Sequence, residues 1–277
     1  MCAKRLGTLP RPRDLAIMRL YYWNLNNNVE SVRLLKESFG LFSNAVFAFS
    51  EFWDIIDSVK SLEDQYTVWH DVIHGRTGLF SGEDFSFVPE SAYRYYSVHS
   101  FVYNNMKILL FVVHLRSQVR SEVDAKTCSI GVQREIDVII KQHDWPHVVI
   151  VGDFNLAHFE QVFLNFCYFN ATNYYSEDYD DYKTFEGERR LKYYNPISAL
   201  NGDMSSGPPG TYYYNIPSQS QAWHTFDQAL ISYPLAKYLK KTECCVLTRI
   251  GNVELLTDNS RPNKKISDHL PIKIEFM

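Results

Sequence analysis

Short runs of β-branched and aromatic residues recur from one end of the chain to the other, and apolar residues at helical spacing separate some of them. Runs of this length and composition are typical of strands. Two runs meet at Asn104-Asn105, a pair that favours a hairpin turn. Helical spacing occurs at 29–39, 52–59, 132–140 and 159–166. The expected strands are 17–23, 45–49, 66–73, 93–101, 107–114, 147–151, 211–215, 226–232, 246–250 and 272–276.

Hairpins mixed with helical crossovers indicate an α+β fold with mixed or antiparallel sheets covered by helices. Hydrophobic residues make up 45% of the 277 positions, so the chain has enough apolar material for a core. No sequence repeat and no clear linker interrupts it. We therefore expect a basic N-terminal segment over 1–15, open to flexibility, and one domain over 16–277.

The net charge, the cysteines and the lengths of the apolar runs limit which class of protein this chain can belong to. A net charge of −4 argues against coating nucleic acid through bulk positive charge, although an enzyme could still contact a few phosphates. The five cysteines form no Cys-x-x-Cys pair, which favours a reducing compartment. The N-terminus lacks the apolar stretch of a signal peptide, and the longest apolar run, 108–113, is too short to span a bilayer. We expect a cytoplasmic protein without membrane insertion.

The apolar run 147–151 leads directly into Gly152-Asp153-Phe154-Asn155. The glycine would let the chain turn sharply at the end of the strand. In an extended geometry Asp153 and Asn155 share one face while Phe154 points the other way. A carboxylate beside a carboxamide suits a metal-bound phosphate centre, but Asp-x-Asn after a strand is also ordinary turn chemistry.

A second motif, Ser267-Asp268-His269, stands just before the last strand. It could supply a metal ligand and a group that exchanges protons near neutral pH, although Asp-His pairs are frequent in loops.

Four more apolar runs end in, or contain, a residue that is costly to bury unless it is paired or metal-bound: Asn24, Glu51, His114 and Asp227. Each alone could have a structural role. Their number in one chain favours a shared site.

With these motifs, the sequence resembles the endonuclease/exonuclease/phosphatase superfamily of deoxyribonuclease-like, metal-dependent phosphodiesterases. The resemblance runs from about residue 17 to the C-terminus. It implies a four-layer α-β-β-α sandwich of two packed mixed sheets flanked by helices, with the site at one edge of the sheets. The matching pieces are Trp23-Asn24, Glu51, Val113-His114-Leu115, Gly152-Asp153-Phe154-Asn155, Phe226-Asp227 and Ser267-Asp268-His269.

The resemblance also implies roles for the acidic and amide residues. Glu51 would be the principal metal ligand, with Asp268 assisting, and Asn24 would contact the phosphate or a second metal. Asp153 and Asn155 would orient or deprotonate the attacking water and bind the phosphate. Oxygen donors of this kind favour Mg²⁺ or Mn²⁺ over Zn²⁺.

The same resemblance makes His269 the general base or the phosphate-polarising histidine, with Asp227 fixing its tautomer. His114 matches a second histidine of the deoxyribonuclease and sphingomyelinase branches. Arg76 is a weaker candidate for a phosphate contact, and a structural role for it is equally open.

Substrate choice is less constrained. His114 and the basic cluster Arg261, Lys264 and Lys265 favour an endonuclease acting on nucleic acid, with DNA favoured over RNA. The alternative is a phosphatase or phosphodiesterase acting on a phospholipid head group or a small phosphorylated molecule. A third possibility is a non-catalytic binding module on the same fold.

Overall fold

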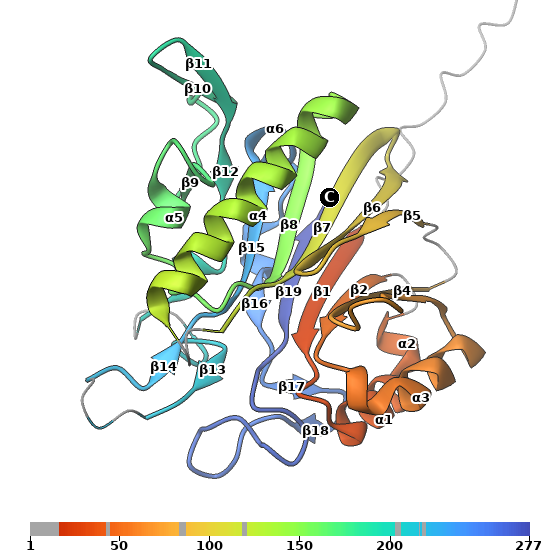
Figure 1. Cartoon of the computed structure of the whole chain (residues 1–277). Helices are drawn as coiled ribbons and strands as arrows, with labels where there is room; N and C mark the ends of the chain where they lie inside the picture. Colours follow the sequence, from red (N-terminus) through yellow and green to blue (C-terminus); the bar gives the residue numbers. More distant parts are fainter. Residues whose placement is uncertain are drawn as a thin grey trace, which may run out of the picture.

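The computed structural model describes residues 17–42, 45–82, 87–117, 121–202, 206–215, 217 and 220–277. The basic segment expected at 1–15 lies outside the described residues. Two large sheets form the centre of the molecule, and helices cover their outer faces (Figure 1).

The first sheet has six strands, in which β1 runs parallel to β2 and antiparallel to β19. In order across the sheet, the strands are β16 (Cys245–Val246), β19 (Ile272–Phe276), β1 (Met18–Asn24), β2 (Ala45–Ser50), β4 (Thr77–Ser81) and β3 (Thr67–His70).

The second sheet has seven strands. The hairpin between β6 and β7 turns at Asn104 and Asn105, whose φ angles of 47° and 63° are those that a two-residue turn requires. β7 then runs parallel to β8. In order, the strands are β5 (Phe87–Ala92), β6 (Tyr96–Tyr103), β7 (Met106–His114), β8 (His147–Asp153), β15 (Asp227–Ser232), β12 (Tyr193–Tyr194) and β9 (Ala171–Thr172).

Smaller elements lie around the two sheets. Three two-stranded pairs are β10 (Tyr182–Phe185) with β11 (Glu188–Leu191), β13 (Tyr212–Tyr213) with β14 (Trp223–His224), and β17 (Arg249–Ile250) with β18 (Val253–Glu254). The helices are α1 (Val29–Glu37), α2 (Phe39–Phe42), α3 (Ile56–Lys60), α4 (Glu122–His143), α5 (Gln161–Leu164) and α6 (Tyr233–Ala236). Single 3₁₀ turns are η1 (Trp53–Ile55), η2 (Ser61–Asp64), η3 (Ser198–Leu200) and η4 (Lys241–Glu243).

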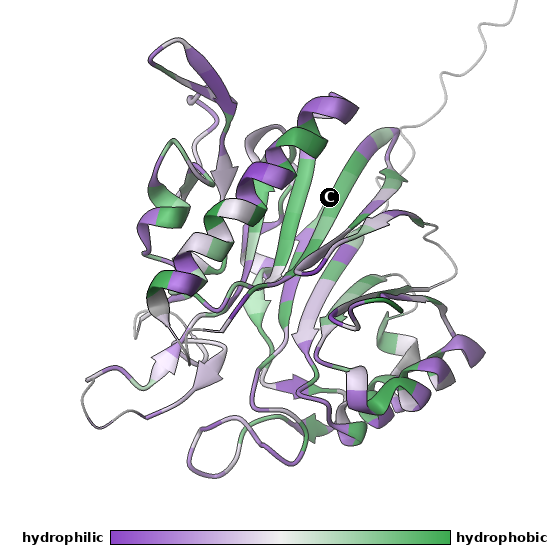
Figure 2. Cartoon of the chain, viewed as in Figure 1, coloured by the Kyte–Doolittle hydropathy of each residue, from purple (hydrophilic) through white to green (hydrophobic). Residues whose placement is uncertain are grey.

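Successive side chains of each central strand point to opposite faces of its sheet, and this alternation produces a four-layer sandwich. In β1, Leu20 and Tyr22 face the second sheet, whereas Tyr21 and Trp23 face the layer that contains α1 and α3. Both faces of β1 are therefore buried, and the same holds for β7 and β8, which are hydrophobic along nearly their whole length (Figure 2). α4 covers the outer face of the seven-stranded sheet (Figure 1). The predicted fold class is confirmed.

The element boundaries differ from the sequence prediction in several places. The helix expected at 132–140 begins ten residues earlier, because Ser121 caps α4 by accepting a hydrogen bond from the Asp124 N–H. The apolar residues of 159–166 form only one helical turn, since Phe163 packs into an aromatic cluster with Phe154 and Phe169. Strands β4 and β5 were not predicted, and 246–250 is split between β16 and β17. Among the described residues, no helix has both the length and the apolar character needed to cross a membrane.

Candidate active site

The strand ends named in the sequence analysis meet at one edge of the sandwich. Asn24 is the last residue of β1, and Glu51 directly follows β2, the parallel neighbour of β1. In the other sheet, His114 ends β7 and is paired in register with Asp153, the last residue of β8. Asp227 begins the antiparallel strand β15 and also lies opposite Asp153. Five polar residues from the two sheets are thus brought to the same edge.

Asn24 joins the two sheets through its side chain. Its Nδ2 donates to Glu51 Oε1 at 3.0 Å and to Asp153 Oδ2 at 3.1 Å. Its Oδ1 accepts a hydrogen bond from the Asn26 N–H at 3.0 Å. Asn24 was expected to contact a metal or the phosphate. In this arrangement its amide nitrogen faces the carboxylates, so Asn24 positions the two acids.

Glu51 is the most accessible acid of the group, with about a third of its side chain exposed (31%). Its Oε1 lies 3.2 Å from His114 Nε2. Burial alone would raise the pKa of Glu51, but the hydrogen bond and charge of His114, with the Asn24 amide, lower this pKa to about 2. Glu51 is therefore a carboxylate at neutral pH. The sequence analysis assigned no carboxylate to His114, and in the structure Glu51 contacts it.

Asp153 is fully buried behind Glu51. Burial raises the pKa of Asp153 to about 6, because the charged form loses its hydration, and the negative charge of Asp227 acts in the same direction. Its Oδ1 accepts from the Asn155 N–H at 2.8 Å. The Asn155 side chain donates to the Leu115 carbonyl at 3.1 Å, so this interaction ties the end of β8 to the end of β7.

His269 lies between two carboxylates. Its Nδ1 is 2.8 Å from Asp227 Oδ2, and its Nε2 is 4.0 Å from Asp153 Oδ2. Burial opposes the charged imidazolium, but the charge and hydrogen bond of Asp227, together with Asp153 and Asp268, raise the pKa of His269 to about 10. Asp227 therefore holds Nδ1 in one orientation and leaves Nε2 directed toward Asp153.

The loop that carries His269 is fixed by hydrogen bonds to β1. Ser267 Oγ donates to the Asn24 carbonyl at 2.8 Å and accepts from the His269 N–H at 3.1 Å. Trp23 Nε1 donates to the His269 carbonyl at 2.9 Å. The Ser267-Asp268-His269 motif is thus held against the same strand that ends in Asn24.

Within the described ranges, two sets of side chains place their potential ligand atoms within 4.8 Å of one another: Glu51, His114 and Asp153, and Asp153, Asp227 and His269. The second set is completely buried, and its histidine is already bonded to Asp227. The first set contains two carboxylates, of which Glu51 is accessible, and the imidazole of His114. This donor set fits a hard divalent cation such as Mg²⁺ or Mn²⁺.

Asp268 and Arg76 lie at the edge of this arrangement. Asp268 is half-buried and belongs to neither of the two ligand sets among the described residues. Burial raises the pKa of Asp268, and the nearby Glu51 charge adds to this effect. The Arg76 guanidinium lies 5.2 Å from the ring centre of Tyr95, whose carbonyl accepts the His114 N–H. Arg76 is therefore next to the His114 side of the site.

Two tyrosines of the site were missed by sequence reasoning. The Tyr22 hydroxyl is buried beneath the acids, 2.6 Å from Ser50 Oγ. The Tyr212 ring lies 4.6 Å from the His269 ring, between centres. Tyr22 gives no signal in the sequence that separates it from other core aromatics. Tyr212 belongs to the tyrosine run of 212–214, which could have identified an aromatic wall.

Comparisons with known proteins give matches only among solved structures. No family model and no curated protein matches this sequence. TDP2 from D. rerio, complexed with a single-strand DNA product, is 14% identical, with 95% of this chain and 99% of that chain covered and a TM-score of 0.59. An endonuclease/exonuclease/phosphatase family protein from Bacteroides thetaiotaomicron is also 14% identical, with coverage of 95% and 98% and a TM-score of 0.57.

The chain has the endonuclease/exonuclease/phosphatase fold. A mannosyl-6-phosphatase from the same bacterium shares this fold at 14% identity, with coverage of 94% and 99% and a TM-score of 0.57. Solved structures with this fold therefore include one holding a DNA product and one phosphatase. The fold resemblance drawn from the sequence motifs is confirmed.

Proposed function

We propose that the protein is a divalent-metal-dependent phosphodiesterase that cleaves a nucleic acid backbone. The observation that carries this proposal is the Asn24 side chain, which links the Glu51 carboxylate of one sheet to the Asp153 carboxylate of the other. This link places the accessible Glu51 and the buried Asp153 close to the His269–Asp227 pair. Acids, an amide and an oriented imidazole are the groups that phosphoryl transfer requires.

Glu51, His114 and Asp153 would hold the cation, which when bound supplies Lewis-acid stabilisation of the phosphate. His269 would carry the proton at Nε2, because Asp227 occupies Nδ1. Asp153, 4.0 Å from that nitrogen, would orient the attacking water. Asn24 would keep the two carboxylates at a fixed separation, and Asp268 would add negative charge beside Glu51.

Nucleic acid is the substrate class that we favour, with DNA ahead of RNA and endonucleolytic cleavage. The solved structure of TDP2 with a single-strand DNA product has the same fold, and a basic cleft lies beside His269 in this chain. The second candidate is a small phosphorylated molecule or a lipid head group. The mannosyl-6-phosphatase of the same fold favours that alternative.

A substrate panel tests the proposal. Supercoiled DNA, single-stranded DNA, RNA, a sugar phosphate and a phosphoinositide are incubated with the protein in Mg²⁺ and in chelator. We expect hydrolysis of nucleic acid that chelation stops. For His269→Ala we expect a loss of about 10²–10⁴-fold in kcat/KM, since a general acid or base contributes about that much.

The matched control is His143→Ala, because His143 lies in the last turn of α4, away from the site. This variant should cleave like the wild type. Intact DNA and RNA together with a hydrolysed sugar phosphate or lipid would establish the second candidate. Tight binding without hydrolysis of any substrate would indicate a non-catalytic module.

A further inference from the structure

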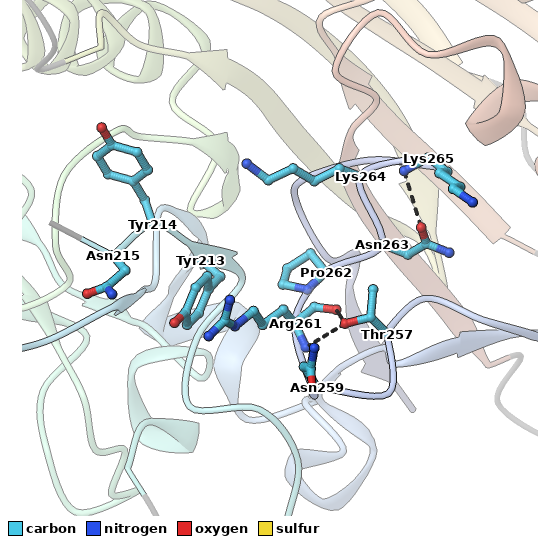
Figure 3. Close-up of a pocket in the computed structure, with 10 residues that line it drawn as sticks. All are labelled: Tyr213, Tyr214, Asn215, Thr257, Asn259, Arg261, Pro262, Asn263, Lys264 and Lys265. Atoms are coloured by element: carbon cyan, nitrogen blue, oxygen red, sulfur yellow. Dashed lines mark hydrogen bonds between the residues drawn. The ribbon is translucent and has the colours of Figure 1, made fainter.

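A cleft of about 480 Å³ opens beside the candidate active site. One wall is formed by Tyr213 of β13 with Tyr214 and Asn215, which follow it, and the other by the loop 257–265 (Figure 3). The volume lies within the range typical of small-ligand sites. Arg261, Lys264 and Lys265, which the sequence suggested as phosphate contacts, all line this cleft.

Both walls are attached to the residues that carry the proposed chemistry. Tyr212 of β13 forms a β-bridge with His269, and the Leu270 N–H donates to the Thr211 carbonyl at 2.8 Å. The opposite loop leads directly into Asp268 and His269. The side chain of Asn28, the N-cap residue of α1, donates to the Lys265 carbonyl at 3.0 Å. A ligand in the cleft would therefore lie next to the group bound at Glu51 and His269.

The loop side of the cleft is cationic. None of the ten lining residues is acidic. Arg261 places its guanidinium 4.6 Å from the ring centre of Tyr213, and in the described part of the chain neither Arg261 nor Lys264 forms an ion pair with a carboxylate. Figure 3 shows Arg261 and Lys264 extending toward the tyrosine wall, whereas the Lys265 side chain points the other way. Arg261 and Lys264 therefore direct positive charge into the space between the walls, and Lys264 also lies near the Asp268 carboxylate.

The opposite side of the cleft is aromatic. Tyr213 is contacted over its ring by the Arg261 guanidinium and packs edge-to-face with Trp223, whose ring centre is 5.4 Å away. Tyr214 is 53% exposed, and the Lys264 ammonium points toward it across the cleft (Figure 3). Tyrosine rings offer flat surfaces on which bases stack, and stacking does not depend strongly on base identity.

We propose that this cleft binds one unpaired nucleotide next to the scissile phosphate, with the base stacked on Tyr214 and the phosphate contacted by Arg261 and Lys264. This inference rests on the proposed function and specifies its substrate as single-stranded or splayed nucleic acid. A base within a continuous duplex cannot offer its face to Tyr214, because neighbouring bases cover both faces.

Binding measured without metal tests this inference independently of hydrolysis. Fluorescence anisotropy in chelator gives Kd for a labelled single-stranded DNA oligonucleotide and for a blunt duplex of two fully complementary strands. For the single strand, Tyr214→Ala should raise Kd roughly tenfold, whereas Tyr214→Phe keeps the ring and should bind like the wild type. For the duplex, Tyr214→Ala should change Kd little.

The charge contribution is measured by salt titration. Lys264→Gln should weaken single-strand binding and reduce the slope of log Kd against log salt by about 0.7, the contribution of one phosphate contact. Lys141→Gln, on the last turn of α4, is the matched control and should leave the slope unchanged. Thermal unfolding of each variant verifies that it is folded.

Wild-type Kd values in both Tyr214→Ala and Lys264→Gln would overturn the inference, even if the wild type cleaves nucleic acid. An equal loss for single strand and duplex would also overturn it, because stacking on an unpaired base would then not be the cause. A wild type that binds single strands through Tyr214 and Lys264 but hydrolyses nothing would instead refute the proposed function and leave the cleft assignment intact.

Discussion

Glu51 and Asn155 have left-handed backbone conformations, each with φ of 51°, although neither is glycine. Such conformations cost on the order of 1–3 kcal/mol for a non-glycine residue and are concentrated at functional sites. At Glu51 the turn comes directly after β2 and directs the carboxylate to Asn24 and His114. At Asn155 it allows the N–H to bond Asp153. The backbone conformations that orient the two acids therefore lower the free energy of unfolding of the protein.

His99 is a buried histidine outside the site, and it predicts a pH dependence of stability. Burial lowers the pKa of His99 to about 3 from an ordinary value of 6.5. The unfolded chain therefore binds one more proton than the folded chain between these pH values. This contribution to stability is present above pH 6.5 and is lost as pH falls toward 3, by about 1.4 kcal/mol per pH unit.

Chemical denaturation of the wild type and His99→Phe across this pH range measures the effect. The difference in slope between the two proteins isolates His99 from the carboxylates that titrate in the same range. A His99→Phe slope identical to that of the wild type would contradict the prediction.

The sequence could identify polar residues at strand ends, because burying such groups is costly and their positions are visible in the apolar pattern. It could not predict the orientation of each side chain. Contact of Asn24 with a metal or phosphate stays a prediction, and the bonds of its amide nitrogen to two carboxylates could not be foreseen. The His114–Glu51 contact was also missed, since it depends on how the two sheets are placed against each other.

At Gly152, a close contact between the backbones of β7 and β8 leaves room only for glycine. The motif suggested a turn at this glycine, but Gly152 lies within β8 and is paired with Val113 of β7. Its φ is 153°, and an added Cβ would lie 1.9 Å from the Val113 carbonyl oxygen. The backbones approach so closely here that no side chain fits. Gly152 therefore keeps the ends of β7 and β8 aligned, and with them His114 and Asp153.

Replacing Gly152 by Ala should lower the free energy of unfolding by at least about 2 kcal/mol, because the Val113 backbone cannot move away without distorting the sheet. Gly131→Ala in α4 is the matched control. It has no atom within 4 Å of the added Cβ and should stabilise the protein by about 0.5–1 kcal/mol through helix propensity. Denaturant unfolding measures both values. Equal effects of the two substitutions would contradict this explanation.

Strands were predicted better than helices. β1, β7 and β8 are long apolar runs, so their pattern was clear in the sequence. α4 was underestimated because only its C-terminal half carries a regular apolar stripe, whereas its start depends on the Ser121 cap. The two-residue strand β9 could not be predicted, since tertiary pairing with β12 defines it, whereas β13 lies within the strand expected at 211–215.

The two sheets contribute different parts of one candidate metal site. Glu51 comes from the six-stranded sheet, and His114 and Asp153 come from the seven-stranded sheet. The Asn24–Asp153 hydrogen bond crosses between them. Fold class was predictable from the order of elements and the family resemblance. The sequence predicted that these strand ends share a site. Their positions relative to one another depend on how the two sheets pack, which the sequence pattern does not reveal.

Calorimetric titration with Mn²⁺ tests most directly whether Glu51, His114 and Asp153 form a metal site. The wild type should bind the ion, and Glu51→Gln should weaken binding by more than about tenfold, because it removes the accessible carboxylate. Asp57→Asn, whose side chain is 95% exposed on α3, should bind like the wild type. Wild-type affinity in Glu51→Gln, or no Mn²⁺ binding by the wild type, would contradict the metal-site assignment.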